Sequence, residues 1–235
     1  MEKNWKIKET NSKIVQGLSE SLGISRTIAH LLVLRGVTTY DEAKQFFRPD
    51  FSHFHKPFLM KDMQKAVDRI QQAISNNEKI LVYGDYDVDG TTSVAMMWTF
   101  LSTVTDNIDF YIPCRYKEGY GISLQGIDYA KENNFSLIIA LDCGTRAVQQ
   151  IDYANEKEVD FIICDHHNPA EKIPNAVAIL NPKQSDCNYP FKELSGCGVG
   201  FKLIQGYCEK NQIPLKEITH LLDFLVVSIA ADIVS

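Results

Sequence analysis

Hydrophobic and polar positions alternate between two patterns over the larger part of the chain. Helical periods, with apolar residues three or four positions apart, occupy 61–74, 92–104, 124–134 and 146–158. Apolar runs of strand length occupy 79–84, 107–112, 136–142 and 159–165, and a shorter one follows at 176–180. Strands separated by helices of this length form βαβ units. We therefore predict an α/β fold, with a largely parallel sheet flanked by helices on both faces.

The first 55 residues follow a different pattern. Amphipathic helical periods occupy 12–23, 25–36 and 40–47, and a linker follows. We interpret His53 and His55 in this linker as surface histidines, because no acidic or cysteine partner lies near them in sequence. The sequence thus predicts a small helical segment with a linker over 1–55 and an α/β domain over 56–235.

Acidic and imidazole side chains follow three of the expected strands. They are Asp85, Asp87 and Asp89 after the first strand, Asp142 after the third, and Asp165, His166 and His167 after the fourth. The carboxyl ends of parallel strands meet at one edge of the sheet, where such folds bind ligands. Carboxylates placed so close repel one another unless a cation lies between them. The pattern predicts a metal site at this edge rather than a solvated acidic turn.

The run of alternating aspartates also resembles the start of an EF-hand calcium loop. That loop requires a glutamate at its twelfth position, where this chain has Met96, and a helix rather than a strand before it. A ligand set rich in oxygen, with one or two imidazoles, suits Mn²⁺ or Mg²⁺ better than Zn²⁺. With five aspartates available, we expect two ions, an arrangement that can clamp a phosphate and activate water for phosphodiester hydrolysis.

Two further segments are candidates for phosphate or nucleic-acid contact. The loop 112–121 interleaves Arg115 and Lys117 with Tyr120, and such residues can hold phosphates and stack bases, although a surface loop with scattered charges explains them equally well. Gly198 belongs to a glycine cluster ahead of a helical run, where backbone N–H groups could approach a phosphate. A tight packing turn is the alternative. A dinucleotide-binding motif is excluded, because it would follow the first strand.

Composition narrows the classes of protein. With 45% hydrophobic and 23% charged residues, the chain can bury a core, and no apolar run approaches membrane-spanning length. The opening ten residues are too polar for a signal peptide, so we expect a cytoplasmic protein with no membrane partner. A net charge of -6 argues against a general nucleic-acid coat protein but not against a nuclease. Six cysteines without a CxxC pair suggest neither a zinc ribbon nor a disulfide framework.

Five motifs in order, GDYDVDGTTS, LDCG, DHH, GCGVGFK and AADIVS, resemble the DHH phosphoesterase family, and most closely its single-stranded-DNA exonucleases. The resemblance implies that Asp85 and Asp87 serve one metal ion and that Asp142 bridges two. It assigns Asp89, His166 and Asp232 to the second ion, although the position of Asp232 alone, at the end of an apolar helix, would not mark it as a ligand. By the same resemblance His167 faces the scissile phosphate, and Asp165 orients the histidines.

The resemblance further implies a 5′-to-3′ exonuclease of DNA repair and recombination that releases 5′-mononucleotides. Single-strand-binding protein and a helicase would be its partners beside the DNA. Family members of this kind continue into a second, DHHA1-like domain and an oligonucleotide-binding fold, whereas this sequence stops three residues after Asp232. We therefore expect the chain to be the catalytic part of a longer protein, with reduced activity on its own.

Two alternatives remain open at this point. The first is a phosphodiesterase of the same superfamily that acts on short RNA or cyclic dinucleotides, or a related pyrophosphatase, because the metal ligands alone do not select the substrate. The second is a catalytically inactive scaffold. Such a scaffold should have lost ligands, and all six expected positions are filled in this sequence.

Overall fold

The structure is a computed structural model that describes residues 4 and 6–234. It divides into two compact units, Met1–Phe54 and His55–Ser235. The first unit contains α1 (Ser12–Leu22), α2 (Arg26–Leu34), α3 (Tyr40–Phe47) and the short 3₁₀ helix η1 (Phe51–His53). The α-helices begin where Asn11, Ser25 and Thr39 accept hydrogen bonds from first-turn N–H groups. The predicted helical lead-in is confirmed.

The second unit contains a five-stranded sheet in which every pair of neighbours is parallel, in the order β2-β1-β3-β4-β5. Its first half comprises η2 (Pro57–Leu59), α4 (Met63–Ser75), β1 (Lys79–Gly84), α5 (Val88–Leu101), β2 (Ile108–Tyr111) and α6 (Leu124–Glu132). Its second half comprises β3 (Phe135–Leu141), α7 (Val148–Glu156), β4 (Asp160–Cys164), β5 (Ala178–Leu180), α8 (Gly196–Lys210), η3 (Leu215–Leu221) and α9 (Leu222–Asp232). The predicted α/β fold with a parallel sheet is confirmed.

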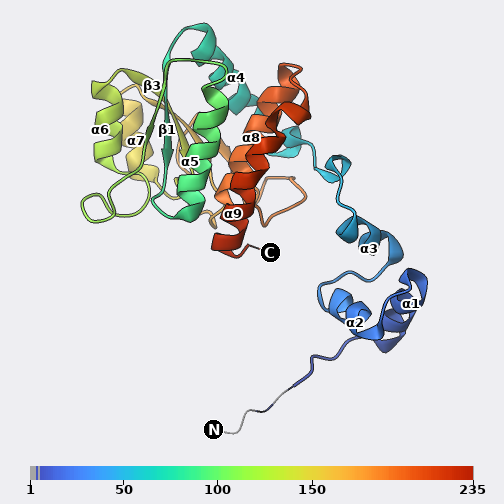
Figure 1. Ribbon diagram of the computed structural model, residues 1–235. Helices are drawn as coiled ribbons and strands as arrows, with labels where there is room; N and C mark the ends of the chain where they lie inside the picture. Colours follow the sequence, from blue (N-terminus) through green and yellow to red (C-terminus); the bar gives the residue numbers. More distant parts are fainter. Residues whose placement is uncertain (1–3, 5, 235) are drawn as a thin grey trace. The chain divides into compact units, whose positions relative to one another are not determined.

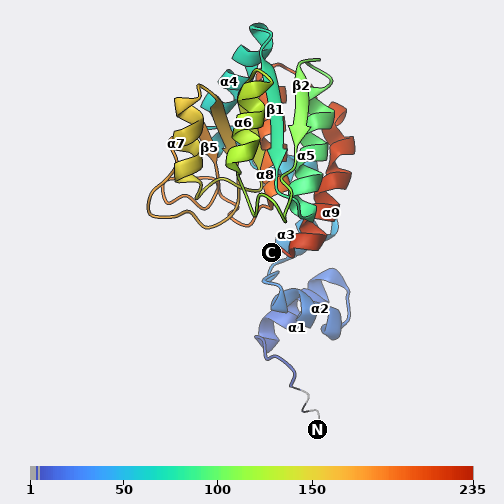
Figure 2. The same cartoon turned by 90° about the vertical axis from the view of Figure 1, so that its left-hand side faces the viewer.

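Helices cover both faces of this sheet, as Figures 1 and 2 show. On one side α6 and α7 pack over a buried cluster that includes Leu81, Tyr83, Ile138 and Phe161. On the other side lie α4, α5, α8 and α9, with α8 in contact with both β3 and β4. The central strands are apolar without alternation because both of their faces are buried.

The strand order fixes where a ligand site can form. The chain leaves β1 toward β2 on one side and returns to β3 on the other, so the connections diverge between β1 and β3, at the topological switch point. The register pairs Gly84 with Leu141 and Leu141 with Cys164. The residues that follow these three strands are therefore neighbours at one edge of the sheet.

Helices α5 and α8 begin earlier in the chain than the hydrophobic pattern indicates. Helix α5 begins at Val88 instead of residue 92, because the side chain of Asp87 accepts a hydrogen bond from the N–H of Gly90. Helix α8 begins at Gly196, because Ser195 caps it in the same way. The glycine cluster, expected ahead of the helix, therefore lies within its first turns, and Asp89 lies in the first turn of α5.

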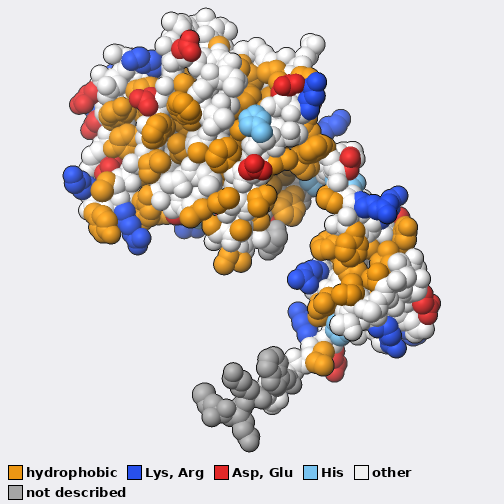
Figure 3. Space-filling model, in the orientation of Figure 1, with side chains coloured by type: hydrophobic (Ala, Val, Ile, Leu, Met, Phe, Trp, Pro, Cys, Tyr) orange, Lys and Arg blue, Asp and Glu red, His pale blue; other side chains and the backbone are white. Residues whose placement is uncertain are grey.

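Part of the apolar surface of the second unit stays exposed. Val226, Val227 and Ile229 on α9 and Trp98 on α5 are among the exposed large apolar side chains, and Figure 3 shows hydrophobic side chains gathered over this face. Among the described residues, no helix combines the length and hydropathy needed to cross a membrane.

Candidate metal centre

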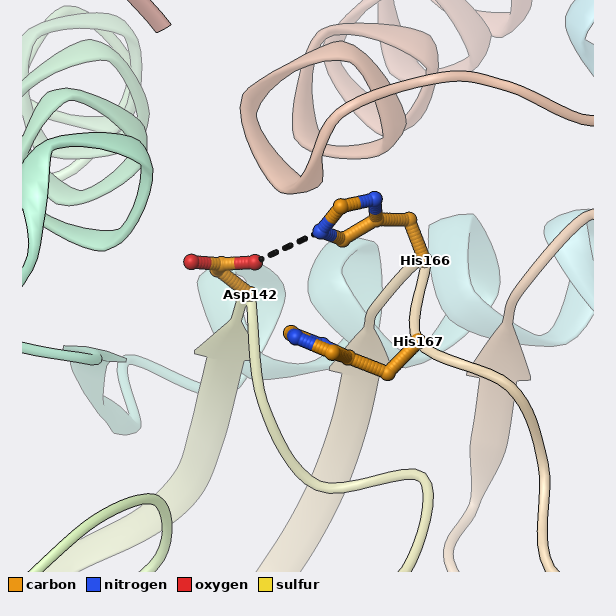
Figure 4. Close-up of side chains that lie close together, drawn as sticks. All are labelled: Asp142, His166 and His167. Carbon is orange, nitrogen blue, oxygen red and sulfur yellow. Dashed lines mark ion pairs between the residues drawn. The ribbon is translucent and has the colours of Figure 1, made fainter. Parts of the chain in front are cut away.

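The predicted ligands follow β1, β3 and β4 at the carboxyl edge of the sheet or lie in α5 and α9. The imidazole of His166, which follows β4, is the centre of this group. Its Nε2 lies 3.1 Å from Oδ1 of Asp142, 3.7 Å from Oδ2 of Asp89 and 3.6 Å from Oδ2 of Asp232. Figure 4 shows the Asp142–His166 pair, with His167 below it. Three carboxylates around one imidazole form a compact set of oxygen and nitrogen donors.

Within the part of the chain that the structure describes, two groups of potential ligands are compact. One consists of Asp142, His166 and His167, and the other of Asp89, His166 and Asp232, with ligand atoms within 4.8 Å of one another. The second group is the set that the family resemblance implies for one ion. Asp232, the last residue of α9, reaches this group from a helix that lies far along the chain from β4.

Asp89 is almost fully buried and is held by groups from two other helices. Its carboxylate accepts hydrogen bonds from the N–H of Gly196 at 2.6 Å and of Cys197 at 2.8 Å, at the N-terminus of α8. The hydroxyl of Ser228 in α9 adds a third bond at 2.7 Å. A helix N-terminus stabilises a negative charge, since its first N–H groups lack partners within the helix. These three bonds fix the carboxylate of Asp89 in position.

Asp142 has a strained backbone and a close neighbour. Its φ of 60° lies in the left-handed region, which aspartate tolerates better than most residues and which often marks functional sites. Gly196 lies so close to Asp142 that a Cβ added to this glycine would lie 2.5 Å from Cβ of Asp142. Only glycine therefore allows the start of α8 to approach the carboxylate.

Asp85 and Asp142 each have a buried carboxylate oxygen without a hydrogen-bond donor. Burial, together with the nearby charges of Asp89 and Asp87, raises the pKa of Asp142 to about 10. Burial, with a contribution from Asp87, also raises the pKa of Asp85. Among the described side chains, Oδ2 of Asp85, Oδ1 of Asp142 and Nδ1 of His166 are buried without a hydrogen-bond partner. A divalent cation would supply the missing charge, so these residues fit a metal centre.

Asp85 and Asp87 belong to neither compact group. One oxygen of Asp85 accepts the N–H of Tyr86 at 2.8 Å, and one oxygen of Asp87 accepts that of Gly90 at 2.9 Å. Asp87 is exposed, whereas Asp85 is fully buried. The sharing of an ion by Asp85, Asp87 and Asp142 therefore stays a prediction.

Asp165 orients the second histidine. Its Oδ1 accepts the N–H groups of His166 and His167 and lies 2.7 Å from Nδ1 of the His167 ring, while Oδ2 accepts the N–H of Thr145. Burial alone would raise the pKa of Asp165, but these hydrogen bonds, led by that of the His167 ring, hold it well below its ordinary value. The same bond raises the pKa of His167.

The outer nitrogen of His167 faces the loop that was predicted to bind substrate. Nε2 of His167 lies 3.2 Å from the hydroxyl of Tyr120. The ring of Tyr120 packs edge-on against Tyr86, over which the guanidinium of Arg115 lies 5.4 Å from the ring centre. Arg115 and Tyr120 are thus brought to the metal centre. Lys117 is exposed, and its N–H bonds to Cys114.

The glycine predicted to contact phosphate has another role. Gly198 is buried in the first turn of α8, where its N–H donates to Ser195 at 3.1 Å. The N–H groups of Gly196, Cys197 and Gly198 donate to Asp89 and Ser195 within the protein, so the structure favours the packing role of this glycine cluster. Sequence reasoning placed Gly196 in the glycine cluster but not beside Asp89 and Asp142. It missed Ser195 and Ser228, although the serine before the glycine cluster is a recognisable N-cap signal.

Comparisons with known proteins identify the family of this domain. Residues 79–229 match the N-terminal domain of the DHH family. The chain is 44% identical over 230 residues to the single-stranded-DNA-specific exonuclease RecJ of Bacillus subtilis, an alignment that covers 98% of this chain and 28% of that protein. The chain therefore spans less than a third of the length of this curated relative.

Solved structures show the same fold. An exonuclease RecJ crystallised with manganese matches with a TM-score of 0.67 and 27% identity, over 74% of this chain and 44% of that one. RecJ of Thermus thermophilus in complex with Mn²⁺ matches with a TM-score of 0.77 and 21% identity, over 96% of this chain and 31% of that one. The relatives were solved with one of the two metals predicted from the ligand chemistry.

Proposed function

Since the chain belongs to the DHH family, we propose that residues 55–235 form the catalytic unit of a metal-dependent exonuclease that hydrolyses single-stranded DNA. The observation that carries the proposal is the convergence of Asp89, Asp142, His166 and Asp232. Two of these residues, Asp142 and His166, have buried potential ligand atoms without a hydrogen-bond partner. The similarity to RecJ proteins supports the choice of substrate.

Asp89, His166 and Asp232 would hold one Mn²⁺ or Mg²⁺ ion, Asp85 and Asp87 the other, and Asp142 both. Such ions supply positive charge to the oxygens of a scissile phosphate. Two N–H groups at the N-terminus of α8 hold Asp89 in place, and Gly196 permits the close approach of Asp142. The protein thus offers a rigid, negatively charged cradle for two ions.

His167, oriented by Asp165, would donate a proton to the leaving oxygen. The hydrogen bond to Asp165 fixes the ring and favours its protonated form, so Nε2 of His167 can donate a proton toward the cleft. Tyr120 holds the same nitrogen at 3.2 Å before substrate binds. Arg115 supplies a positive charge for a phosphate of the strand.

We extend the proposal to cleavage from the 5′ end with release of 5′-mononucleotides, to a cytoplasmic location, and to single-strand-binding protein and a helicase as partners. These extensions rest on the similarity to the exonuclease RecJ of Bacillus subtilis. Further DHHA1-like and oligonucleotide-binding domains, and the boundary near residue 55, also stay predictions.

A binding measurement and a substrate panel test the proposal. Calorimetric titration with Mn²⁺ should show binding that His166→Ala and Asp89→Asn abolish, whereas His53→Ala, at an exposed histidine of the first unit, should leave it unchanged. With Mn²⁺ present, single-stranded DNA labelled at its 5′ end should release labelled mononucleotides.

The other substrates in the panel separate the alternatives. Faster hydrolysis of a ribodinucleotide, a cyclic dinucleotide or pyrophosphate than of DNA would contradict the proposed substrate. Absence of Mn²⁺ binding would favour an inactive scaffold instead.

A further inference from the structure

A pocket of ≈ 300 Å³ lies directly beside the metal centre. His167 and Asp165 line one side of it. Its inner wall is apolar and buried, and consists of Ile122, Cys143 and the half-buried Ala147. The volume is at the lower limit of small-molecule sites, about 300 Å³ or more, so it suits a single small ligand. None of the six residues proposed above as metal ligands lines this pocket.

The outer rim of the same pocket is polar. Arg146 lies at this rim, and its Nε donates to the backbone oxygen of Asn168 at 2.8 Å, which anchors the guanidinium there. Gln150, in the first turn of α7, is half-buried and offers both a donor and an acceptor. An apolar wall with a few polar groups at its mouth is typical of sites for flat organic ligands.

The ring of Tyr120 completes the pocket and connects it with the scissile position. Tyr120 lines the pocket and its hydroxyl reaches His167. An aromatic ring stacks on any nucleobase, because every base has a π face. A base held here would therefore lie within one nucleotide of the phosphate that His167 faces.

On the premise of the proposed function, we infer that this pocket holds the base of the terminal nucleotide, the one that is released. The apolar wall and Tyr120 contact the faces of the base, and Gln150 and Arg146 contact its polar edge. A pocket of this size admits one nucleotide and not a continuing strand. Because the amide of Gln150 can both donate and accept, the pocket accepts all four bases with similar affinity.

Two adjacent glutamines provide a matched test. Gln150 lines the pocket, whereas Gln149, the preceding residue of α7, is exposed and does not. Binding of dAMP in the presence of Mn²⁺ is measured by calorimetry for the full chain. We expect Gln150→Ala to weaken dAMP binding about fivefold, as expected for one lost hydrogen bond, with Gln149→Ala unchanged. Equal affinities for the two variants would overturn the inference.

A second variant fills the pocket. Ala147→Leu adds apolar volume at its wall, so it should weaken dAMP binding more than Gln150→Ala while the affinity for Mn²⁺ alone stays unchanged. Unchanged dAMP affinity in this variant would also overturn the inference. Because these experiments measure dAMP binding and not DNA hydrolysis, they can refute the inference about the pocket without refuting the proposed function. A chain that binds dAMP through Gln150 but leaves DNA intact would contradict only the latter.

Discussion

Replacing Asp165 by asparagine tests how the histidine pair is held. The carboxylate of Asp165 is buried and accepts bonds from the backbone of His166 and His167, from the His167 ring and from the N–H of Thr145. Asparagine has nearly the same shape but only one acceptor oxygen and no charge. The change therefore removes a single electrostatic feature without creating a cavity.

The expected cost follows from these contacts. Three bonds converge on Oδ1, so the amide oxygen of the new side chain would occupy that position and its NH₂ group would face the N–H of Thr145. Leaving these buried donors unsatisfied costs about 1–3 kcal/mol. Each of the other three bonds loses its charged acceptor, a difference of about 1 kcal/mol per bond. We expect the free energy of unfolding to fall by about 4–6 kcal/mol, which overlaps the range of about 3–5 kcal/mol for a broken buried pair.

Urea unfolding with a chelator present measures this loss without any contribution from metal. In a Trp5→Phe background, the fluorescence of Trp98 in α5 follows the second unit. Asp128→Asn is the control, because Asp128 on α6 also accepts bonds from Tyr153 and Lys157 but is exposed to solvent. The control should change stability little, since water replaces those partners.

The dependence on pH supplies a second check. The pKa of Asp165 is lower in the folded protein than in the unfolded chain. Its stabilisation is therefore fully present above about pH 4, the unfolded value, and is lost as the pH falls toward the folded pKa. The difference between wild type and Asp165→Asn should shrink below that pH. A difference at pH 7 no larger than that of Asp128→Asn would refute the reasoning.

Three further predictions concern other parts of the site and the core. Gly196→Ala should lower the affinity for Mn²⁺ at least about tenfold in calorimetry, because the new methyl group displaces Asp142. Gly17→Ala in α1 is the control and should leave the affinity unchanged, because nothing lies within 4 Å of its new methyl group. Equal effects of the two variants would contradict this prediction. Mn²⁺ at about 100 times its Kd should raise the free energy of unfolding by about 2.7 kcal/mol, and His166→Ala should abolish the gain. Burial lowers the pKa of Lys202 to about 8, below its unfolded value of about 10.4. Between these pH values the unfolded chain binds more protons, so the stability of the wild type should rise with pH. Urea midpoints should show this rise in the wild type but not in Lys202→Met.

Much of the fold was predictable because its signals are local. Periodicity identified every strand to within about two residues, and β1 in full, since β1, β3, β4 and β5 are short apolar runs buried on both faces. Helix starts were less predictable. Asp87 and Ser195 extend α5 and α8 toward the site through side-chain bonds that hydropathy does not show.

The sequence alone indicated most of the residues that could form the metal centre, because parallel strands deliver the residues after them to one edge of the sheet, whereas Asp232 followed only from the family resemblance. Only the tertiary structure decided how those residues are held. The bonds from Gly196 and Ser228 to Asp89 join positions 107 and 139 residues apart. Such contacts depend on how α8 and α9 pack against α5, and side-chain packing between distant segments has no local signature in the chain.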